Sequence, residues 1–177
     1  MKLKREKNVD EYIIDSLFDL MKNKEYSDIS ITEITDKAGV GRVSFYRNFN
    51  SKEDIIKKWI TNTTDSFLEN SDISYKNDST KDYFIKLFTH LDKYKEEAYL
   101  IYKANLFNLL KEEFDSKLIN LHQKEYSNYK SYFIAGGIFN VYYFWLINGS
   151  KETPKELANK MVDLMYRKIT IFRFVAK

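Results

Sequence analysis

The chain has 177 residues, of which 44% are hydrophobic, and this is enough apolar material for a substantial core. Its formal net charge is only +3, so bulk charge does not by itself indicate a nucleic-acid partner. The absence of cysteine excludes disulfides, thiolate metal sites and cysteine nucleophiles, and it fits a reducing cytoplasm, where we expect the protein to reside.

Turn-forming residues are scarce, since the chain has one proline and five glycines, too few for the many tight turns of an all-β fold. Long stretches with apolar residues at helical spacing therefore predict an all-α protein. The first predicted helix spans about residues 8–23, where apolar residues recur every four positions from Val9 to Met21. The basic residues 1–7 precede no apolar stretch, so they form no secretory signal; they are either solvated or reach into a minor groove.

A short helix, a tight turn and another short helix are predicted between about residues 28 and 49. Ser30 and Glu33 have the S-x-x-E spacing of a capping box, in which the serine hydroxyl accepts from the glutamate amide and the carboxylate reaches back. Gly39 is placed to adopt the left-handed conformation that closes a helix, and the next helix begins near Arg42. This arrangement is typical of a helix-turn-helix.

The third predicted helix, residues 42–49, presents two different faces when successive residues are 100° apart. Phe45 and Phe49 lie on one face, which we expect to pack in the core. Val43 and Arg47 point the opposite way. The outward face, its flanks and the first turn then carry small, aromatic and cationic side chains, namely Arg42, Val43, Ser44, Tyr46 and Arg47.

The same region resembles the DNA-binding domain of the tetracycline-repressor (TetR) family over about residues 8–58. Its most specific part is an apolar-Tyr-x-x-Phe element at residues 45–49, followed by Ser51-Lys52-Glu53. Two positions depart from the family pattern: Gly41 replaces the usual Ser or Thr helix cap, and Val43 stands where a glycine is common. The base preference of relatives therefore cannot be transferred to this chain.

The resemblance implies a role for each candidate DNA-binding residue. Phosphates would be contacted by Ser30, Thr32, Ser44, Tyr46 and Lys52. Bases would be read by Arg42, Val43 and Arg47. Hydroxyls at helix N-termini are natural phosphate ligands, and arginine can donate two hydrogen bonds to guanine. The plainer alternative is that Tyr46 packs on the core, that the three cations are solvated and that Ser30 only caps its helix.

The predicted organisation is a three-helix DNA-binding head at residues 1–50 and a helical effector-binding and dimerisation domain at 51–177, whose first helix, 51–70, connects the two. A polar loop at 71–80 precedes further helices. These are predicted at roughly 81–94, 96–111, 114–130, 131–148 and 154–174. Residues 132–147 are uncharged but fall short of the roughly 20 needed to cross a bilayer, so we expect a buried helix and no membrane span.

The last two predicted helices are apolar nearly all round, which requires more burial than a chain of this size readily supplies. Two helices from each of two subunits would form a four-helix bundle, so we expect a homodimer. The residues expected at this interface are Gly136, Gly137, Trp145, Met161 and Met165. The alternative is that these helices bury their apolar surface within one monomer.

Many aromatic residues lie between positions 81 and 130. In the TetR family this region encloses an effector pocket, so the resemblance implies a small apolar or aromatic effector, with its contact residues unassigned. The plainer alternative is that these aromatic residues are core. His90 and His122 lack metalloprotease spacing, and no phosphate-binding loop or nucleophile motif is present. We therefore expect no enzymatic activity, no metal and no cofactor.

The resemblance and the residue pattern together predict a sequence-specific transcriptional regulator that binds an inverted-repeat operator in double-stranded DNA as a homodimer. The first hypothesis is a repressor released by a small-molecule effector, and activation is left open. The alternative is a helical protein-interaction module whose helix-turn-helix no longer contacts DNA.

Overall fold

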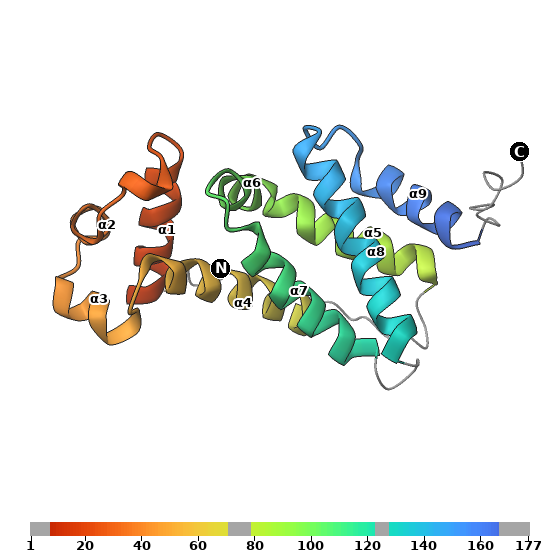
Figure 1. The fold of residues 1–177 in the computed structure, drawn as a ribbon, viewed down its shortest axis with the longest axis horizontal. Helices are drawn as coiled ribbons and strands as arrows, with labels where there is room; N and C mark the ends of the chain where they lie inside the picture. The colour runs from red at the N-terminus through yellow and green to blue at the C-terminus, as the bar shows by residue number, and fades with distance from the viewer. Residues whose placement is uncertain (1–7, 71–78, 123–127, 167–177) are drawn as a thin grey trace, which may run out of the picture.

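The computed structural model describes residues 8–70, 79–122 and 128–166 (Figure 1). Within these ranges it contains nine α-helices, one short 3₁₀ helix and no strand, which confirms the predicted all-α fold. The elements are α1 (Val9–Met21), η1 (Tyr26–Asp28), α2 (Ile31–Ala38), α3 (Arg42–Asn48), α4 (Lys52–Asn70), α5 (Thr80–Lys93), α6 (Lys95–Lys103), α7 (Phe107–His122), α8 (Asn128–Ile147) and α9 (Pro154–Tyr166). None of the helices in the described part of the chain has both the length and the apolarity that a bilayer crossing requires.

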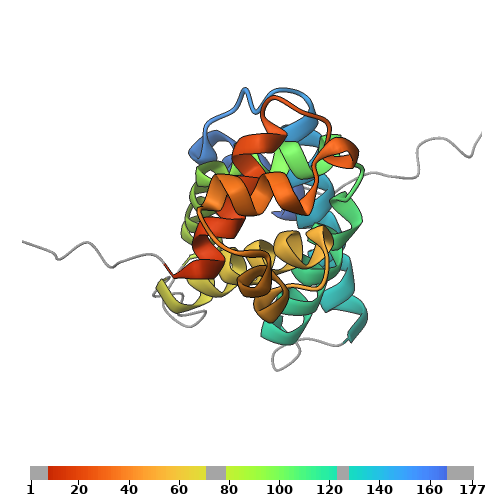
Figure 2. The same cartoon turned by 90° about the vertical axis from the view of Figure 1, so that its left-hand side faces the viewer.

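Helices α1 to α3 form a head at one end of the molecule, which faces the viewer in Figure 2. Helix α1 begins with a capping box, because Asn8 Oδ1 accepts from the Glu11 amide at 2.9 Å and the Glu11 carboxylate accepts from the Asn8 amide at 3.1 Å. The helix packs against α2, α3 and α4. The buried residues that hold the head together include Ile13, Leu17, Ile34, Phe45 and Phe49.

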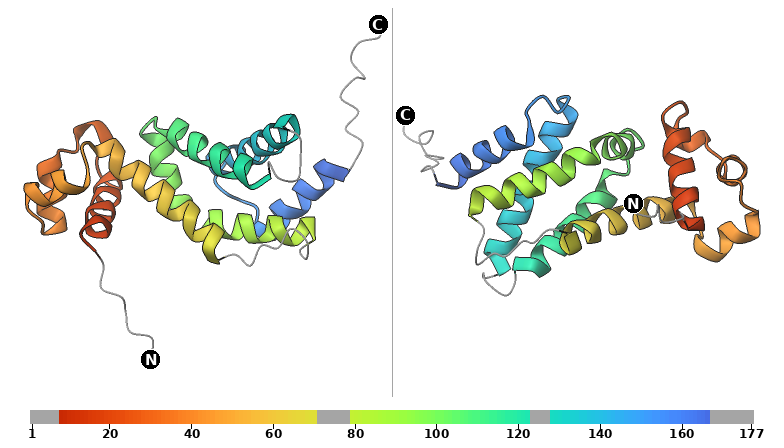
Figure 3. Two further views of the ribbon diagram at one scale, coloured as in Figure 1. Left: turned by 90° about the horizontal axis from the view of Figure 1, so that it is seen from below. Right: turned by 180° about the vertical axis from the view of Figure 1, so that it is seen from behind.

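Helix α4 leaves the head and runs along the remaining helices (Figure 3). Buried residues recur along it at helical spacing, at Ile56, Ile60 and Phe67, and the helix packs against both α1 and α7. One continuous hydrophobic core therefore extends from the head into the rest of the chain.

Helices α5 to α9 form the body. Helix α5 lies alongside α9, α7 lies alongside α8, and α6 contacts α1 of the head (Figures 1 and 3). The largest side chains that are fully buried in the body are aromatic or branched, and they include Phe84, Phe88, Ile101, Ile138 and Tyr142. The body is thus two pairs of helices, joined to the head through α4 and α6.

The structure corrects two predicted helices in the middle of the chain. The sequence predicts helices at 96–111 and 114–130, whereas α6 ends at Lys103 and α7 begins at Phe107. Asn105 separates them with φ of 59°, in the left-handed region that ends helices. Asparagine is one of the few residues besides glycine that adopts this conformation readily. The prediction was wrong because no glycine or proline lies at residues 103–107 to mark the break.

Each of the other predicted helices has a counterpart near the predicted residues. The last one, expected to reach residue 174, is described as far as Tyr166, and its remainder lies outside the described residues. The basic segment 1–7 lies outside them as well.

Candidate nucleic-acid interface

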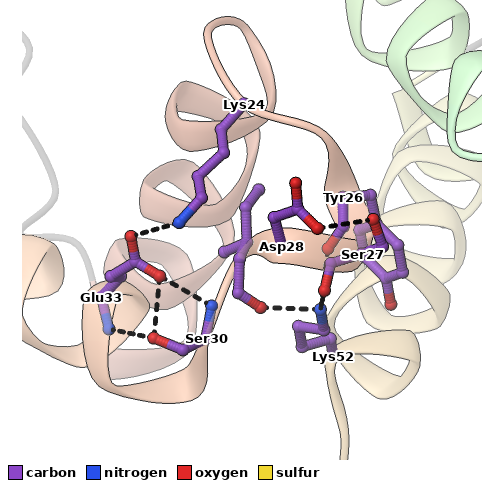
Figure 4. A network of polar contacts seen from close by, with 8 residues as sticks. Lys24, Tyr26, Ser27, Asp28, Ser30, Glu33 and Lys52 are labelled. Carbon is purple, nitrogen blue, oxygen red and sulfur yellow. Dashed lines mark hydrogen bonds and ion pairs between the residues drawn. The ribbon is translucent and has the colours of Figure 1, made fainter.

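The first residues of α2 form the capping box that the sequence predicts (Figure 4). Ser30 Oγ accepts a hydrogen bond from the Glu33 amide at 3.2 Å, and Glu33 Oε2 accepts one from the Ser30 amide at 2.9 Å. Lys24 Nζ lies 2.7 Å from the other carboxylate oxygen. The hydrogen bond from Lys24, followed by those from Ser30, lowers the pKa of Glu33 to about 2. The ionised carboxylate therefore holds the exposed Ser30 and the start of α2 in place.

The turn between α2 and α3 contains the predicted left-handed glycine. Gly39 has φ of 67° and ψ of 31°, which a residue with a Cβ adopts only at a cost. The Gly39 amide donates to the Asp36 carbonyl at 3.2 Å, and the Val40 amide donates to the Thr35 carbonyl at 3.1 Å. These bonds satisfy the last carbonyls of α2, so the turn fixes where α3 starts.

Helix α3 has the two faces that its sequence predicts. Phe45 and Phe49 are buried, whereas Val43 and Tyr46 expose 69% and 58% of their surface. The Tyr46 ring meets the Phe45 ring edge to face, with centroids 5.3 Å apart, so Tyr46 rests on the core and still faces solvent. Arg47 is exposed as well, and Ser44 is partly exposed. Apolar, aromatic and cationic groups therefore lie together on the outside of the head.

The cations of the head divide into paired and unpaired groups. The lysines of residues 8–50 all form ion pairs, Lys22 and Lys37 with Asp19 and Lys24 with Glu33. Arg42 donates from Nη2 to Thr32 Oγ1, which joins the first turns of α2 and α3. No carboxylate of the described residues pairs with Arg42 or Arg47. The charges of α3 thus remain available to an anionic ligand.

Lys52, which the resemblance assigns to a phosphate, is engaged by the protein itself (Figure 4). Its Nζ donates to the carbonyls of Tyr26 and Ile29 at 2.7 Å each and lies 4.5 Å from the centroid of the Tyr26 ring. The Tyr26 carbonyl also accepts from the Ile29 amide at 3.3 Å, so Lys52 is a second donor to it, and Lys52 also donates to the Ile29 carbonyl. A phosphate contact would require the ammonium to leave these carbonyls. Helix α4 itself begins as predicted, with the Asp54 amide donating to Ser51 Oγ at 3.1 Å.

The residues expected at a subunit interface fall into two groups. Trp145 and Met161 are buried within the chain, with 3% and 5% of their surface exposed, and Trp145 Nε1 donates to a backbone carbonyl of the loop before α9 at 3.0 Å. Gly136 is partly buried, whereas Gly137 and Met165 are exposed and line a groove between α8 and α9. The apolar pattern did not separate the inner from the outer face, because α8 is apolar on both.

Exposed apolar residues continue beyond this groove. They lie toward both ends of α8 and near the described end of α9. The most exposed are Tyr129, Tyr132, Phe133, Phe144 and Tyr166, with Leu164 and Met165 beside them. An apolar surface of this extent is unusual on a monomer and indicates an interaction site.

The body also contains a cavity of about 60 Å³ lined by residues of α4 to α8. This is the space of roughly four water molecules. Trp59 lines the cavity, and its ring lies 5.0 Å from the Phe18 ring of α1 and 6.0 Å from the Tyr94 ring. A chain of aromatic contacts therefore connects the cavity wall to the head. The sequence predicted aromatic residues in this region but not which of them meet.

Two families of known proteins match the chain over most of its length. Residues 13–58 match the family described as "Bacterial regulatory proteins, tetR family", and residues 78–167 match one described as "Transcriptional regulator C-terminal region". No curated protein matches the sequence.

Solved structures share the arrangement of helices. A TetR transcriptional regulator from Streptococcus agalactiae has a TM-score of 0.64 and 17% identity, covering 90% of this chain and 94% of its own. The dihydroxyacetone kinase operon activator DhaS has a TM-score of 0.66 and 19% identity, covering 89% and 93%. The regulator FadR from Bacillus subtilis, solved with stearoyl-CoA, has a TM-score of 0.58 and 20% identity, covering 88% and 96%. At these identities the likeness concerns the fold.

Proposed function

Because this chain belongs to the TetR family of DNA-binding transcriptional regulators, we propose that it binds an inverted-repeat operator as a homodimer in the cytoplasm and that a small molecule in the body cavity releases it. The mode proposed first is repression relieved by that effector. The sign of regulation depends on where the operator lies relative to the promoter, and an activator would use the same contacts.

The observation that carries this proposal is the outward face of α3. Val43 and Tyr46 are largely exposed there beside two arginines that no described carboxylate neutralises. A short helix with such a face, held by a capped helix and a tight turn, can enter a major groove. Its apolar groups can contact thymine methyl groups and its arginines can donate to guanine.

The proposed contacts divide into readers and anchors. Arg42, Val43 and Arg47 would read bases. The anchors to phosphate would be Ser30, Thr32, Ser44, Tyr46 and Lys52, of which Ser30 and Thr32 start α2, where the helix dipole favours an anion. In a symmetric dimer the two α3 helices would enter successive major grooves. The half-site centres of the operator should then lie about 34–36 Å apart, or modestly more if the heads spread.

The proposed dimer uses the exposed apolar residues of α8 and α9. Two such faces would pack as a four-helix bundle, with Gly137 permitting a close approach of the backbones. The proposed effector site is the cavity, which is separate from this groove. Trp59 lines the cavity, and its ring contacts the Phe18 ring of the head. A ligand that displaces the Trp59 ring would therefore also change the contact with the head.

Binding-site selection with wild type and Arg47→Ala tests the assignment of readers. Arg47→Ala should lose its preference at one position of each half-site, at a cost of about 1–3 kcal/mol. Lys155→Ala removes an exposed lysine of α9 and serves as the matched control, which should leave both preference and affinity unchanged. An unchanged preference in Arg47→Ala would show that Arg47 is not a reader. Duplex affinity that does not weaken as salt is raised would favour the protein-interaction module.

A further inference from the structure

One nitrogen in the wall of the body cavity has no hydrogen-bond partner. His90 lines the cavity, and its Nε2 atom is buried without a donor or acceptor among the described residues. The ring contacts two aromatic neighbours, since its centroid lies 5.0 Å from the Phe67 ring and 5.0 Å from the Tyr94 ring.

The protonation of His90 follows from its surroundings. Burial lowers the pKa of the imidazole below its ordinary value, so the ring is neutral at neutral pH. A neutral imidazole carries one proton on one of its two nitrogens, so the unpartnered Nε2 can make one hydrogen bond, either as acceptor or as donor.

Two other polar side chains of the cavity wall are already engaged. Thr64 Oγ1 donates to the Ile60 carbonyl at 2.8 Å. Lys117 Nζ lies 2.7 Å from an Asp65 carboxylate oxygen and 3.7 Å from one of Glu113, so its charge is balanced within the protein. Most of the remaining wall is apolar. The cavity therefore offers a ligand a largely apolar wall that contains the unpartnered Nε2 of His90, and it offers no uncompensated charge for an anion.

We propose that the effector is a small, largely apolar, uncharged molecule with one hydrogen-bonding group, such as a hydroxyl, that bonds to Nε2 of His90. This inference rests on the proposed function, in which the cavity is the effector site. A site with a buried unpartnered nitrogen discriminates against molecules of the same shape that lack a hydrogen-bonding group, because the nitrogen would then stay unpaired. This requirement selects a chemical class, and the size of the cavity favours small members of that class.

Phenol and toluene test this inference, because they have nearly the same shape and only phenol carries a hydroxyl group, which can donate to or accept from Nε2. Their dissociation constants are measured by NMR titration of the full-length protein. Wild type should bind phenol more tightly than toluene by on the order of fivefold. His90→Phe keeps an aromatic ring between Phe67 and Tyr94, and it should lose this preference while still binding toluene.

Thr64→Val is the matched control, because it removes a polar group of the same wall whose donor is already used. It should keep the preference for phenol. In ¹⁵N-labelled wild type, phenol but not toluene should shift the Nε2 resonance of His90, and this readout needs no variant. The chain has only one other histidine, His122, so two imidazoles have to be assigned.

Three results would overturn the inference: equal affinity of wild type for the two probes, a preference that persists in His90→Phe, or no binding of either probe. None of these three results decides whether the protein binds an operator. Operator binding is measured without any ligand, through the salt dependence of duplex affinity and the Arg47→Ala selection, so failure of the ligand class and failure of the regulator function are distinguishable.

Discussion

Glu33 carries a charge on which the first turn of α2 depends. Its pKa of about 2 in the fold lies below the ordinary 4.5, so the ionised form stabilises the folded state. That contribution is fully present above pH about 4.5 and is lost as the pH falls toward about 2. Glu33→Gln lacks the titrating group. The difference in free energy of unfolding between wild type and Glu33→Gln should therefore be largest at neutral pH and shrink through this window, measured by urea unfolding at several pH values.

Glu112→Gln provides the control for this titration, since it removes an exposed carboxylate of α7 that forms no ion pair with the described residues. It measures the effect of the amide substitution alone. A difference between wild type and Glu33→Gln that stays constant from pH 7 to pH 3 would show that the carboxylate does not support the cap.

Residues whose partners lie close in sequence were predictable, and residues with distant partners were not. The cap at Ser30 and the left-handed Gly39 depend on neighbours within five positions, so spacing alone identified them. Lys52 bonds to carbonyls 23 and 26 positions earlier, and no local pattern encodes such a contact. The unpartnered Nε2 of His90 was equally invisible, because it depends on how α5 packs against α4.

The ammonium group of Lys52 links α4 to η1 and to the residue that follows η1. Lys52→Met keeps the aliphatic stem but removes the ammonium that donates to the carbonyls of Tyr26 and Ile29, of which the Tyr26 carbonyl keeps the Ile29 amide as a donor. We expect it to lower the free energy of unfolding by about 1–3 kcal/mol. Chemical denaturation of purified wild type and variant measures this change.

Lys58→Met is the corresponding control on α4, because Lys58 is exposed and forms no ion pair with the described residues. Its free energy of unfolding should stay within about 0.5 kcal/mol of wild type. If Lys52→Met is as stable as this control and only its DNA affinity falls, Lys52 is a phosphate anchor and its contacts to η1 are incidental.

The type and order of the helices followed from the sequence better than their ends and faces. Amphipathic helices such as α1 and α5 bury the stripe that their spacing predicts. Helix α8 has no such stripe, because it is apolar on the side that packs within the chain and on the side that faces solvent. This is why Trp145 and Gly137 were both assigned to a subunit interface although only Gly137 is exposed.

The exposed apolar surface of α8 and α9 makes a prediction about assembly. Phe133, with 80% of its surface exposed, lines the groove between these helices. Wild type should be a dimer at micromolar concentration, with twice the 21.2 kDa mass of one chain. Phe133→Glu should place an unpaired charge in the contact and give monomers. Light scattering coupled to size-exclusion chromatography measures both masses.

Tyr99→Glu tests whether any exposed aromatic residue would have the same effect. Tyr99 lies on α6 and exposes 44% of its surface, and this variant should remain dimeric. Monomeric wild type would rule out the proposed interface, and dissociation of Tyr99→Glu but not Phe133→Glu would move the interface to α6.

The pairing of helices in the body could not be derived from their order. Helix α5 lies beside α9, although three helices intervene in sequence, and the cavity exists only because α4 to α8 converge. Such contacts depend on the shapes of side chains from distant segments. The sequence therefore predicted a helical body with aromatic residues, and the structure was needed to show which of them surround a space.

Trp59 gives the molecule a built-in optical reporter. Indole emission shifts with the polarity around the ring, and this ring touches both the cavity and Phe18 of the head. The chain has only one other tryptophan, Trp145, which is buried near α9 and has its nitrogen satisfied. In a Trp145→Phe protein, a single indole would thus record, without any added dye, both the filling of the cavity and any movement of α1 against the body.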